Sequence, residues 1–383
     1  MNVLILGSGG REHALGWKLK QSKQCGKLLF APGNAGTAAL GRNCDIAIEP
    51  VKQKVVDEIL ALCRHEQVGL VVIGPEDPLA QGLADRLKKG GLGVFGPTAE
   101  GARLEADKVW AKQLMKAASV PTAESRTFAQ AESALAYVRE HETPVVVKAA
   151  GLAKGKGVIV CDDAAEAEAA VRRIMVEREF DDAGDHVVIE ERLTGQEVSI
   201  LALVDGRDMY VLEPSQDHKQ VGEGDTGPNT GGMGAYTPTP LVDEAMMAQI
   251  EREVLVPMID VLRRSEIDYR GVLYAGLMLT TGGIKVLEFN CRFGDPECQP
   301  LMVRMRGDLL EAMLATAEGR LADADIRWDS RVACSVVMCS GGYPGPYEKG
   351  KVITGIDEAE AMGDVTVFHA GTKLDGDGHV VTA

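Results

Sequence analysis

The first hundred residues alternate short apolar runs with helical patterns, and this alternation restricts the fold more than any other feature. Apolar runs typical of buried strands occupy residues 3–6, 28–30, 45–48, 70–73 and 93–95. Helical patterns fill the intervals at 11–20, 51–65 and 79–89. Repeated βα units predict an open parallel sheet with ligands at the carboxyl ends of its strands. We therefore expect an α/β domain over residues 1–103.

The glycine turn at residues 7–10 follows the first apolar run and leads directly into a helical pattern. Backbone N–H groups and the helix dipole favour an anion at such a turn. A dinucleotide site would need a third glycine where Glu12 stands and an acidic residue near position 30, where the sequence has none. The turn therefore favours a monophosphate, held by Gly9, Gly10 and Arg11, over NAD. The loop at 74–78 lies at the same edge, but by itself it is typical of a turn that caps a helix.

A second glycine-rich turn separates two strands at residues 144–148 and 158–160. Val158 directly follows Gly157, so the segment is a hairpin without the spacing of a Walker P-loop. Such a hairpin can close over a triphosphate and supply N–H donors and lysine charge. The alternative is a plain exposed hairpin. Lys148, at the end of an apolar strand, favours the first interpretation because a half-buried lysine needs an anion.

Helices flank this hairpin segment, over residues 100–118, 131–140 and 164–178. The first of them carries Lys108, which by itself is typical of a solvated lysine. The strand 186–191 then leads into a linker, and such an edge can bind adenine through its backbone groups. Glu197, a few residues further on, would reach the ribose.

A third glycine-rich stretch, at residues 222–236, follows Asp217 and Lys219. Its glycine content predicts neither a helix nor a regular strand. Polar residues between the glycines, such as Asn229 and Thr230, indicate a backbone that approaches a ligand closely; a disordered linker is the alternative. The expected elements after it are a helix at 241–264, strands at 271–279 and 284–290, and a helix at 306–318.

The strand at 284–290 carries a pair of oxygen ligands at its end. Glu288 and Asn290 are two residues apart, so they share one face of the strand. A carboxylate beside an amide oxygen suits a hard cation such as Mg²⁺, which completes its shell with phosphates and water. Arg292 follows and can hold an anion next to that metal. The alternative is the ordinary polar face of a strand end.

Bulk properties exclude several classes of partner. The 383 residues are too many for one hydrophobic core and predict two to four domains. A formal charge of −16 disfavours nucleic acid, whose backbone would be repelled. The eight cysteines form no CxxC pair, which favours free thiols in a reducing cytoplasm. No run approaches the ~20 apolar residues of a membrane helix, and the first residues lack the basic segment of a signal peptide.

Taken together, these segments resemble the ATP-grasp superfamily and, within it, most closely the phosphoribosylamine–glycine ligase (glycinamide ribonucleotide synthetase) family. The resemblance spans nearly the whole chain. It implies a multidomain α/β and α+β fold: a Rossmann-like parallel-sheet domain (1–103), an ATP-grasp domain in two parts (104–192 and 193–330) and a partial, β-rich C-terminal domain (331–383). The matching segments are GSGGREHAL (7–15), APGNAGT (31–37), IGPEDPL (73–79), KAAGLAKGKGV (148–158), SQDHK (215–219), GDTGPNTGGMGAY (224–236) and EFNCRFGDPE (288–297).

The resemblance implies an enzyme that joins glycine to 5-phosphoribosylamine with ATP, through glycyl phosphate, in purine biosynthesis. No covalent enzyme nucleophile is needed, so positioning and charge neutralisation carry the catalysis. The implied metal ligands for Mg²⁺ or Mn²⁺ are Glu288 and Asn290, and the implied catalytic residues are Arg292, Lys148 and Asp217. The implied ATP contacts are Lys108, Lys148, Lys154, Gly155, Lys156, Gly157, Glu190, Leu193 and Glu197. The implied substrate contacts are Gly9, Gly10, Arg11, Asn34, Glu76, Asp217, Lys219, Asn229, Thr230 and Arg292.

The chain also departs from the family pattern. Ala150 stands where the family usually has aspartate, and Gln220 stands where it usually has arginine. The family continues beyond residue 383, so the C-terminal domain is expected to be cut short and the chain to lose stability or activity. We expect a monomer or weak homodimer. Competing interpretations are another ATP-grasp carboxylate–amine ligase, such as a purine or dipeptide ligase, and a nucleotide-binding regulator with an inactive site.

Overall fold

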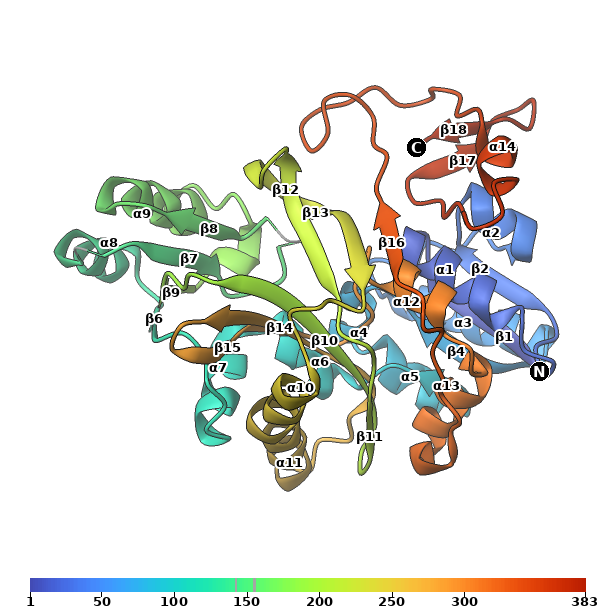
Figure 1. Cartoon of the computed structure of the whole chain (residues 1–383), viewed down its shortest axis with the longest axis horizontal. Helices are drawn as coiled ribbons and strands as arrows, with labels where there is room; N and C mark the ends of the chain where they lie inside the picture. The colour runs from blue at the N-terminus through green and yellow to red at the C-terminus, as the bar shows by residue number, and fades with distance from the viewer. Residues whose placement is uncertain (142, 154–155) are drawn as a thin grey trace.

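The computed structural model describes residues 1–141, 143–153 and 156–383, and these residues form the sheets and helices of Figure 1. The strands are β1 (Asn2–Gly7), β2 (Leu28–Pro32), β3 (Arg42–Asn43), β4 (Val68–Ile73), β5 (Gly93–Phe95), β6 (Ser125–Phe128), β7 (Val145–Ala149), β8 (Val158–Cys161), β9 (Val187–Glu191), β10 (Gln196–Asp205), β11 (Met209–Val211), β12 (Gln216–Gly222), β13 (Thr226–Thr237), β14 (Arg270–Thr280), β15 (Gly283–Asn290), β16 (Ala333–Val336), β17 (Thr372–Leu374) and β18 (Val380–Thr382). The helices are α1 (Gly10–Leu19), α2 (Ala35–Leu40), α3 (Gln53–His65), α4 (Glu76–Ala80), α5 (Leu83–Lys89), α6 (Ala99–Ala106), α7 (Lys108–Ala117), α8 (Ala131–Glu140), α9 (Ala164–Val171), α10 (Glu244–Ile250), α11 (Val256–Arg264), α12 (Cys298–Arg304), α13 (Leu309–Glu318) and α14 (Ile356–Glu360). None of the described helices has the length and hydropathy of a membrane span.

The N-terminal sheet is parallel, as the βα pattern predicts. Its strand order is β3-β2-β1-β4-β5. The chain therefore adds β2 and β3 on one side of β1 and adds β4 and β5 on the other side. Gly7 ends β1 and Gly74 follows β4, so both glycine turns lie at the carboxyl edge where such sheets bind ligands. The glycine turn after β1 and the loop at 74–78 therefore lie side by side.

Two of the predicted elements in this domain are wrong. Residues 45–48 form no strand; the third strand is the two-residue β3, which pairs with Leu29 and Phe30. β2 ends at Pro32, whose nitrogen has no hydrogen to extend the ladder to that segment. The expected helix at 79–89 is divided into α4 and α5, because Gly82 adopts a left-handed φ of 76° that interrupts the helix.

Several helix boundaries also differ from the sequence prediction. The expected helix at 100–118 is two helices, α6 and α7, because Asp107 leaves the helical conformation and caps α7 through the N–H of Trp110. The helix at 164–178 ends as α9 with a π turn at Arg172–Val176. Helix α13 begins at Leu309, and α12 was not predicted.

Two antiparallel sheets follow the parallel one. The first has the order β6-β9-β7-β8 and the second β11-β10-β14-β15. In Figure 1 the first sheet lies at the end of the molecule opposite the parallel sheet, with the second sheet between them. The hairpins predicted around residues 149–157 and 281–283 are confirmed as the β7–β8 and β14–β15 connections.

The prediction that residues 222–236 form no regular strand is wrong. Residues 226–237 form β13, which pairs with β12 on one side and β16 on the other. The β12–β13 ladder has two register irregularities, which accommodate the glycines of this hairpin. Gly232 has a φ of 129°, and a Cβ there would lie 2.3 Å from Pro296 Cδ. The close approach predicted for this backbone is therefore to the 294–297 turn of the protein itself.

The buried hydrophobic side chains of the described residues form three clusters. Two of the core clusters contain residues of both the parallel sheet and the β10–β14 sheet, for example Leu4 with Leu273, and Val3 with Leu201. A third cluster is separate and lies between α8, α9 and the β7–β9 strands, with Val147 and Ile174 among its members. The β6-β9-β7-β8 sheet, the hairpin sheet, therefore has a core of its own, whereas the parallel sheet and the β10–β14 sheet share theirs.

The C-terminal segment returns to the N-terminal domain. Strands β17 and β18 and helix α14 lie beside α1 and α2 in Figure 1. The N–H of His369 donates to Nδ1 of His13 at 2.9 Å, and its carbonyl accepts from the Asn34 side chain at 2.7 Å. Phe368 packs edge-on against His13 and Trp17. These contacts fix the C-terminal segment next to the glycine turn.

Candidate active site

A buried ion pair marks the inner end of the hairpin sheet. In the β7–β9 ladder Lys148 pairs with Val188 and Glu190 pairs with Val146, so the lysine and the glutamate lie diagonally on one face. Lys148 Nζ lies 2.9 Å from Glu190 Oε2 and donates to Leu287 O at 3.1 Å. The anion beside Lys148 in the structure is the Glu190 carboxylate, and a phosphate ligand at Lys148 stays a prediction.

Glu190 has a second lysine neighbour that sequence reasoning missed. Lys112, on α7, lies 3.0 Å from Glu190 Oε1 and donates to Thr122 Oγ1 at 2.8 Å. Glu190 is buried, and each of its two carboxylate oxygens lies 3.0 Å or less from a lysine ammonium group. Because each carboxylate oxygen has two lone pairs, Glu190 Oε1 keeps acceptor capacity for an N–H group of a ligand in the pocket.

Lys108 begins α7 and faces the same pocket. Its N–H donates to Ala150 O at 2.9 Å and its Nζ donates to Gly151 O at 3.0 Å. Both bonds join α7 to the end of β7. Burial lowers the pKa of Lys108, against the opposing effect of Glu288. Ala150, where the family usually has aspartate, contributes here through its backbone.

A β-bulge sets the direction of the proposed metal ligands. The β14–β15 register shifts between Gly276 and Leu277, which face Glu288 and Val286. The extra residue, Leu287, allows Val286 and Phe289 both to enter the core, although strict alternation would place them on opposite faces. Leu287, Glu288, Phe289 and Asn290 all line the pocket. Glu288 and Asn290 therefore lie together, as predicted, but Leu287 lies with them.

Positive charge surrounds Glu288. Burial raises the pKa of its carboxyl group, but the charges of Lys219, Lys148, Lys108 and Arg292 outweigh burial and lower the pKa overall. The carboxylate is therefore held in the ionised form that a cation requires. The structure thus brings the predicted lysines and the predicted metal ligand to one place.

Arg292 occupies a different environment from the free anion site that the sequence suggests. Its Nε lies 3.1 Å from Glu76 Oε2 and an NH2 group lies 2.7 Å from Glu105 Oε1. Burial lowers the pKa of Arg292, but Glu105 and Glu76 outweigh it and raise the pKa far above its usual value. Arg292 is therefore held between two carboxylates, one of which, Glu105, the sequence did not reveal.

Glu105 connects α6 to the residue that follows β15. It accepts the backbone N–H of Cys291 at 2.8 Å and lies near the thiol of the same residue, at 3.2 Å. Burial raises the pKa of Glu105, and the adjacent Arg292 opposes that shift. Glu76, on α4, is held with a lowered pKa, since Arg292 and Arg11 outweigh the effect of its burial.

A second charge cluster lies beside the β12–β13 hairpin. Lys219 Nζ lies 3.2 Å from Glu197 Oε2 and 3.6 Å from Asp217 Oδ2. Burial lowers the pKa of Lys219, but the surrounding carboxylates outweigh it and raise the pKa strongly. The structure thus joins Glu197, which the resemblance assigns to ATP, to Asp217 and Lys219, which it assigns to the substrate.

Glu297, which sequence reasoning did not single out, lies beneath this cluster. Burial, together with the nearby Asp217, raises the pKa of Glu297 to about 7. Its carboxylate accepts hydrogen bonds from Tyr274 and, at 3.4 Å, from Ser199. Asp295 and Glu297 follow Arg292 in the sequence, but the burial of Glu297 depends on the turn at 294–297.

The predicted residues of the β13 strand are less closely involved. Thr230 Oγ1 donates to Lys219 O at 2.7 Å and so supports the lysine backbone. Asn229 is exposed and pairs with Gln220, the second departure from the family pattern. Lys156 is exposed and Leu193 is half-buried, while Gly157 is buried and lines the pocket. Lys154 and Gly155 lie outside the described residues.

The glycine turn at the N-terminus of α1 carries internal carboxylates. Gly9 N donates to Glu12 Oε2 at 2.6 Å, and Arg11 N donates to Asp295 Oδ2 at 3.1 Å. The Glu12 side chain lies so close to Gly7 and Gly74 that a Cβ on either would clash with it. The monophosphate at Gly9, Gly10 and Arg11 stays a prediction, and the N–H groups of Gly9 and Arg11 are engaged by protein carboxylates.

Asn34, also assigned to the substrate, is fully used by the fold. Its Oδ1 accepts the N–H of Thr37 and caps α2, and its Nδ2 donates to Ser8 O and His369 O. The side chain therefore joins the glycine turn to the C-terminal segment, and a direct contact with a sugar phosphate stays a prediction.

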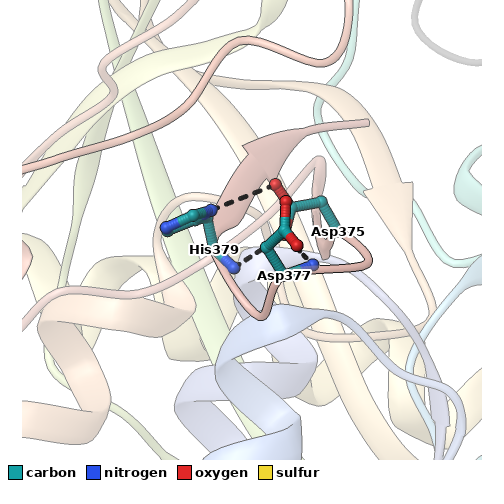
Figure 2. A group of neighbouring side chains, drawn as sticks. All are labelled: Asp375, Asp377 and His379. Carbon is teal, nitrogen blue, oxygen red and sulfur yellow. Dashed lines mark hydrogen bonds and ion pairs between the residues drawn. The ribbon is translucent and has the colours of Figure 1, made fainter.

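Among the described residues, one group of three potential metal-ligating side chains lies outside the pocket, and Figure 2 shows it: Asp375, Asp377 and His379. All three belong to the turn between β17 and β18. Asp375 Oδ1 accepts the N–H groups of Asp377 and His379 at 2.9 and 2.8 Å. These bonds close an aspartate-stabilised hairpin turn, which accounts for the grouping without an ion.

The pocket draws its walls from three parts of the chain. Glu76 comes from the parallel-sheet domain, and Lys148 and Glu190 come from the hairpin sheet. Glu288 comes from the β11-β10-β14-β15 sheet, the central sheet. Solved structures at low sequence identity share this fold: biotin carboxylase from Campylobacter jejuni, in complex with β,γ-ATP, has a TM-score of 0.71 at 17% identity, covering 92% of this chain and 78% of its own. The ATP-grasp (A) domain model of phosphoribosylglycinamide synthetase also matches residues 106–298, so the chain contains an ATP-grasp domain.

Comparison at higher identity defines the family. The models of the phosphoribosylglycinamide synthetase N, ATP-grasp (A) and C domains match residues 1–105, 106–298 and 333–383. The phosphoribosylamine–glycine ligases of Rhodopirellula baltica and Nostoc sp. are each 51% identical, over 98% and 100% of this chain and 87% and 89% of theirs. The crystal structure of the Thermotoga maritima enzyme has a TM-score of 0.84 at 34% identity and covers 100% of this chain and 90% of its own. The chain belongs to the phosphoribosylglycinamide synthetase family, and the resemblance seen in its sequence is confirmed.

Proposed function

We propose that this chain joins glycine to 5-phosphoribosylamine with ATP, giving glycinamide ribonucleotide, ADP and phosphate, as a step of purine biosynthesis. The observation that carries the proposal is the pocket itself. Its lining combines Lys108 and Lys148 with Glu288 and Asn290. A polyphosphate needs the lysines, and its metal needs the two oxygen ligands. The names of the relatives supply the two co-substrates.

The nucleotide lies, in this proposal, between the hairpin sheet and the central sheet. Lys108 and Lys148 neutralise the polyphosphate, and Glu190, held by Lys112 and Lys148, accepts an N–H donor of adenine with its remaining lone pairs. Glu197 and Leu193 contact the ribose and base. Of the hairpin residues assigned to ATP, Lys156 and Gly157 contact the phosphates, and the assignment of Lys154 and Gly155 falls outside the described residues.

The metal site fits a hard cation. Glu288 is held ionised by surrounding positive charge, and the amide oxygen of Asn290 lines the same wall. Glu288 and Asn290 would hold Mg²⁺ or Mn²⁺. When bound, the ion neutralises charge on the phosphates at the transferred group.

The chain's own residues then orient two transfers. A glycine carboxylate oxygen attacks the γ-phosphorus and ADP leaves; the phosphoribosylamine nitrogen then attacks the carbonyl carbon, phosphate leaves and the amine loses a proton. Arg292 lies at the junction, where its charge can stabilise the acyl phosphate once Glu76 or Glu105 yields a hydrogen bond. Asp217 and Lys219 position glycine and the amine. Gly9, Gly10, Arg11 and Asn34 lie on the side of the sugar phosphate.

The division of the chain follows the same scheme. We infer a phosphosugar domain at 1–103, a hairpin subdomain at 104–192, a catalytic subdomain at 193–330 and a C-terminal domain at 331–383. The separate core under the hairpin sheet supports the boundary between residues 192 and 193. The eight free cysteines support a reducing cytoplasmic environment, and we propose a monomer or weak homodimer without nucleic-acid or membrane partners.

The test is phosphate release from ATP with glycine and freshly prepared phosphoribosylamine, omitting each component in turn. We expect release that needs all three and an equal amount of glycinamide ribonucleotide. Release that continues without glycine overturns the ligase assignment. Turnover with a different amine, but none with phosphoribosylamine, would identify another carboxylate–amine ligase.

A further inference from the structure

We propose that Lys112 is a positioning residue for ATP: it holds the Glu190 carboxylate so that Lys148 keeps its orientation and its positive charge toward the polyphosphate. The inference rests on the proposed function, because it places a nucleotide in this pocket. Lys112 is one helical turn after Lys108 on α7, so the two lysines share a face of that helix.

The contacts of Lys112 are all with protein groups. Its Nζ donates to Thr122 Oγ1 at 2.8 Å and to Ala123 O at 3.3 Å, and lies 3.0 Å from Glu190 Oε1. An ammonium group has only three hydrogens to direct. Lys148 uses two, toward Glu190 and Leu287 O, and keeps one for a ligand. Lys112 therefore acts through Glu190, and Lys148 meets the phosphates.

The charges explain why a second lysine is needed. If Lys148 were the only cation beside Glu190, the pair would be neutral and would attract a polyphosphate weakly. With Lys112 the group of two lysines and one carboxylate carries a net charge of +1. The Lys112 and Glu190 side chains are only 10% and 3% exposed, so solvent screens this charge little.

Lys112 is also anchored to the strand that carries the metal ligands. Thr122, which accepts its hydrogen bond, donates through the same hydroxyl to Val286 O at 2.6 Å. Val286 lies two residues before Glu288 on β15. The chain of contacts from Lys112 thus reaches both the hairpin sheet and the central sheet, and fixes Glu190 relative to the phosphate end of the pocket.

The first experiment compares Lys112→Met, Lys112→Arg and Lys116→Met in the full chain. Lys116 is exposed one turn further along α7 and is the matched control. We expect Lys112→Met to raise the KM for ATP about tenfold or more, with kcat and the KM for glycine within about threefold. Lys112→Arg restores the KM for ATP, and Lys116→Met leaves it unchanged. An unchanged KM for ATP in folded Lys112→Met overturns the proposal.

The second experiment tests whether Lys112 acts through Glu190. ADP binding is measured by titration calorimetry for Lys112→Met, Glu190→Gln and the double variant. If Lys112 serves to offset the Glu190 charge, removing it has little further effect in the Glu190→Gln background. Additive losses overturn the proposal. If Lys112→Met does not fold, as judged by its melting curve, Lys112→Gln takes its place. ADP binding needs no ligation, so this result stands even if the wild-type chain fails the glycine-dependence test.

Discussion

Glu76 Oε2 lies 3.1 Å from Arg292 Nε, although the two residues are 216 positions apart in the chain. The pair joins the loop after β4, at the ligand edge of the parallel sheet, to the end of the strand that carries Glu288 and Asn290. The positive charge of Arg11 also lowers the pKa of Glu76, so the glycine turn belongs to the same charge network. The proposed phosphosugar side and the proposed phosphate-transfer side of the pocket therefore share one arginine.

Glu76→Gln should test that coupling. The substitution keeps the shape of the side chain but removes one of the two charges that hold Arg292. We expect a loss of about 1–3 kcal/mol in the free energy of unfolding, since one hydrogen bond to a charged group is weakened at a partly buried site. The kcat/KM for phosphoribosylamine should fall at least tenfold, with the KM for ATP nearly constant. Melting curves and initial rates measure both. Glu100→Gln, exposed on α6, is the control, and equal effects of the two variants would contradict the coupling.

Glu288→Ala should abolish turnover while the chain remains folded. The carboxylate contributes little to packing, and its removal deprives the metal of its only proposed charged ligand. We expect a loss of about 10²–10³-fold or more in kcat, the range for removing a preorganised electrostatic group. The measurement is turnover across a Mg²⁺ titration, with circular dichroism to verify the fold. Normal turnover at saturating Mg²⁺ would refute the metal role.

Local pattern was sufficient for only part of the architecture, because the ATP-grasp arrangement followed from the resemblance to a known family. The βα repeats predicted the parallel sheet, and the i, i+2 spacing placed Glu288 and Asn290 together. The prediction failed where pairing depends on distant residues. The glycine-rich segment at 226–237 becomes a strand because β12 and β16 lie on either side of it, and nothing within the segment specifies these neighbours.

The site residues that sequence reasoning missed share one property, which is that their partners are remote. Glu105 gains its role from Arg292, 187 positions away, and Glu297 becomes buried against Tyr274 and Ser199. Lys112 had one local signal, its i, i+4 spacing from Lys108 on a helix. A lysine on a helix is usually solvated, so that signal gains meaning only once Glu190 is seen beside it.

His13 should make the stability of the chain depend on pH. Burial, with a smaller contribution from His369, lowers the pKa of His13 to about 4. The unfolded chain, with a histidine pKa near 6.5, therefore binds more protons between pH 6.5 and 4. This contribution to stability is complete above pH 6.5 and is lost as the pH falls through that window. The loss should reach about 2 kcal/mol at pH 5.

The measurement is the change in melting temperature between pH 7 and pH 5, for the wild type and His13→Asn. Asparagine does not titrate, and its amide oxygen can still accept the His369 N–H. We expect a smaller change for His13→Asn than for the wild type. His65→Asn is the control, because the His65 side chain is 80% exposed. If His65→Asn reduces the pH dependence as much as His13→Asn, the buried histidine is not its source.

Gly232→Ala should disturb the contact between the β13 strand and the turn after Arg292. A Cβ at this position would lie 2.3 Å from Pro296 Cδ, and the φ of 129° is strained for any residue with a side chain. We expect a loss of about 1–3 kcal/mol in stability, together with lower turnover, because the turn carries Asp295 and Glu297. Gly231→Ala is the matched control, since a Cβ there would meet no atom closer than 3.9 Å. Urea unfolding and initial rates of both variants provide the test. If Gly232→Ala keeps the wild-type stability, the backbone can withdraw from Pro296 and the close packing is not required.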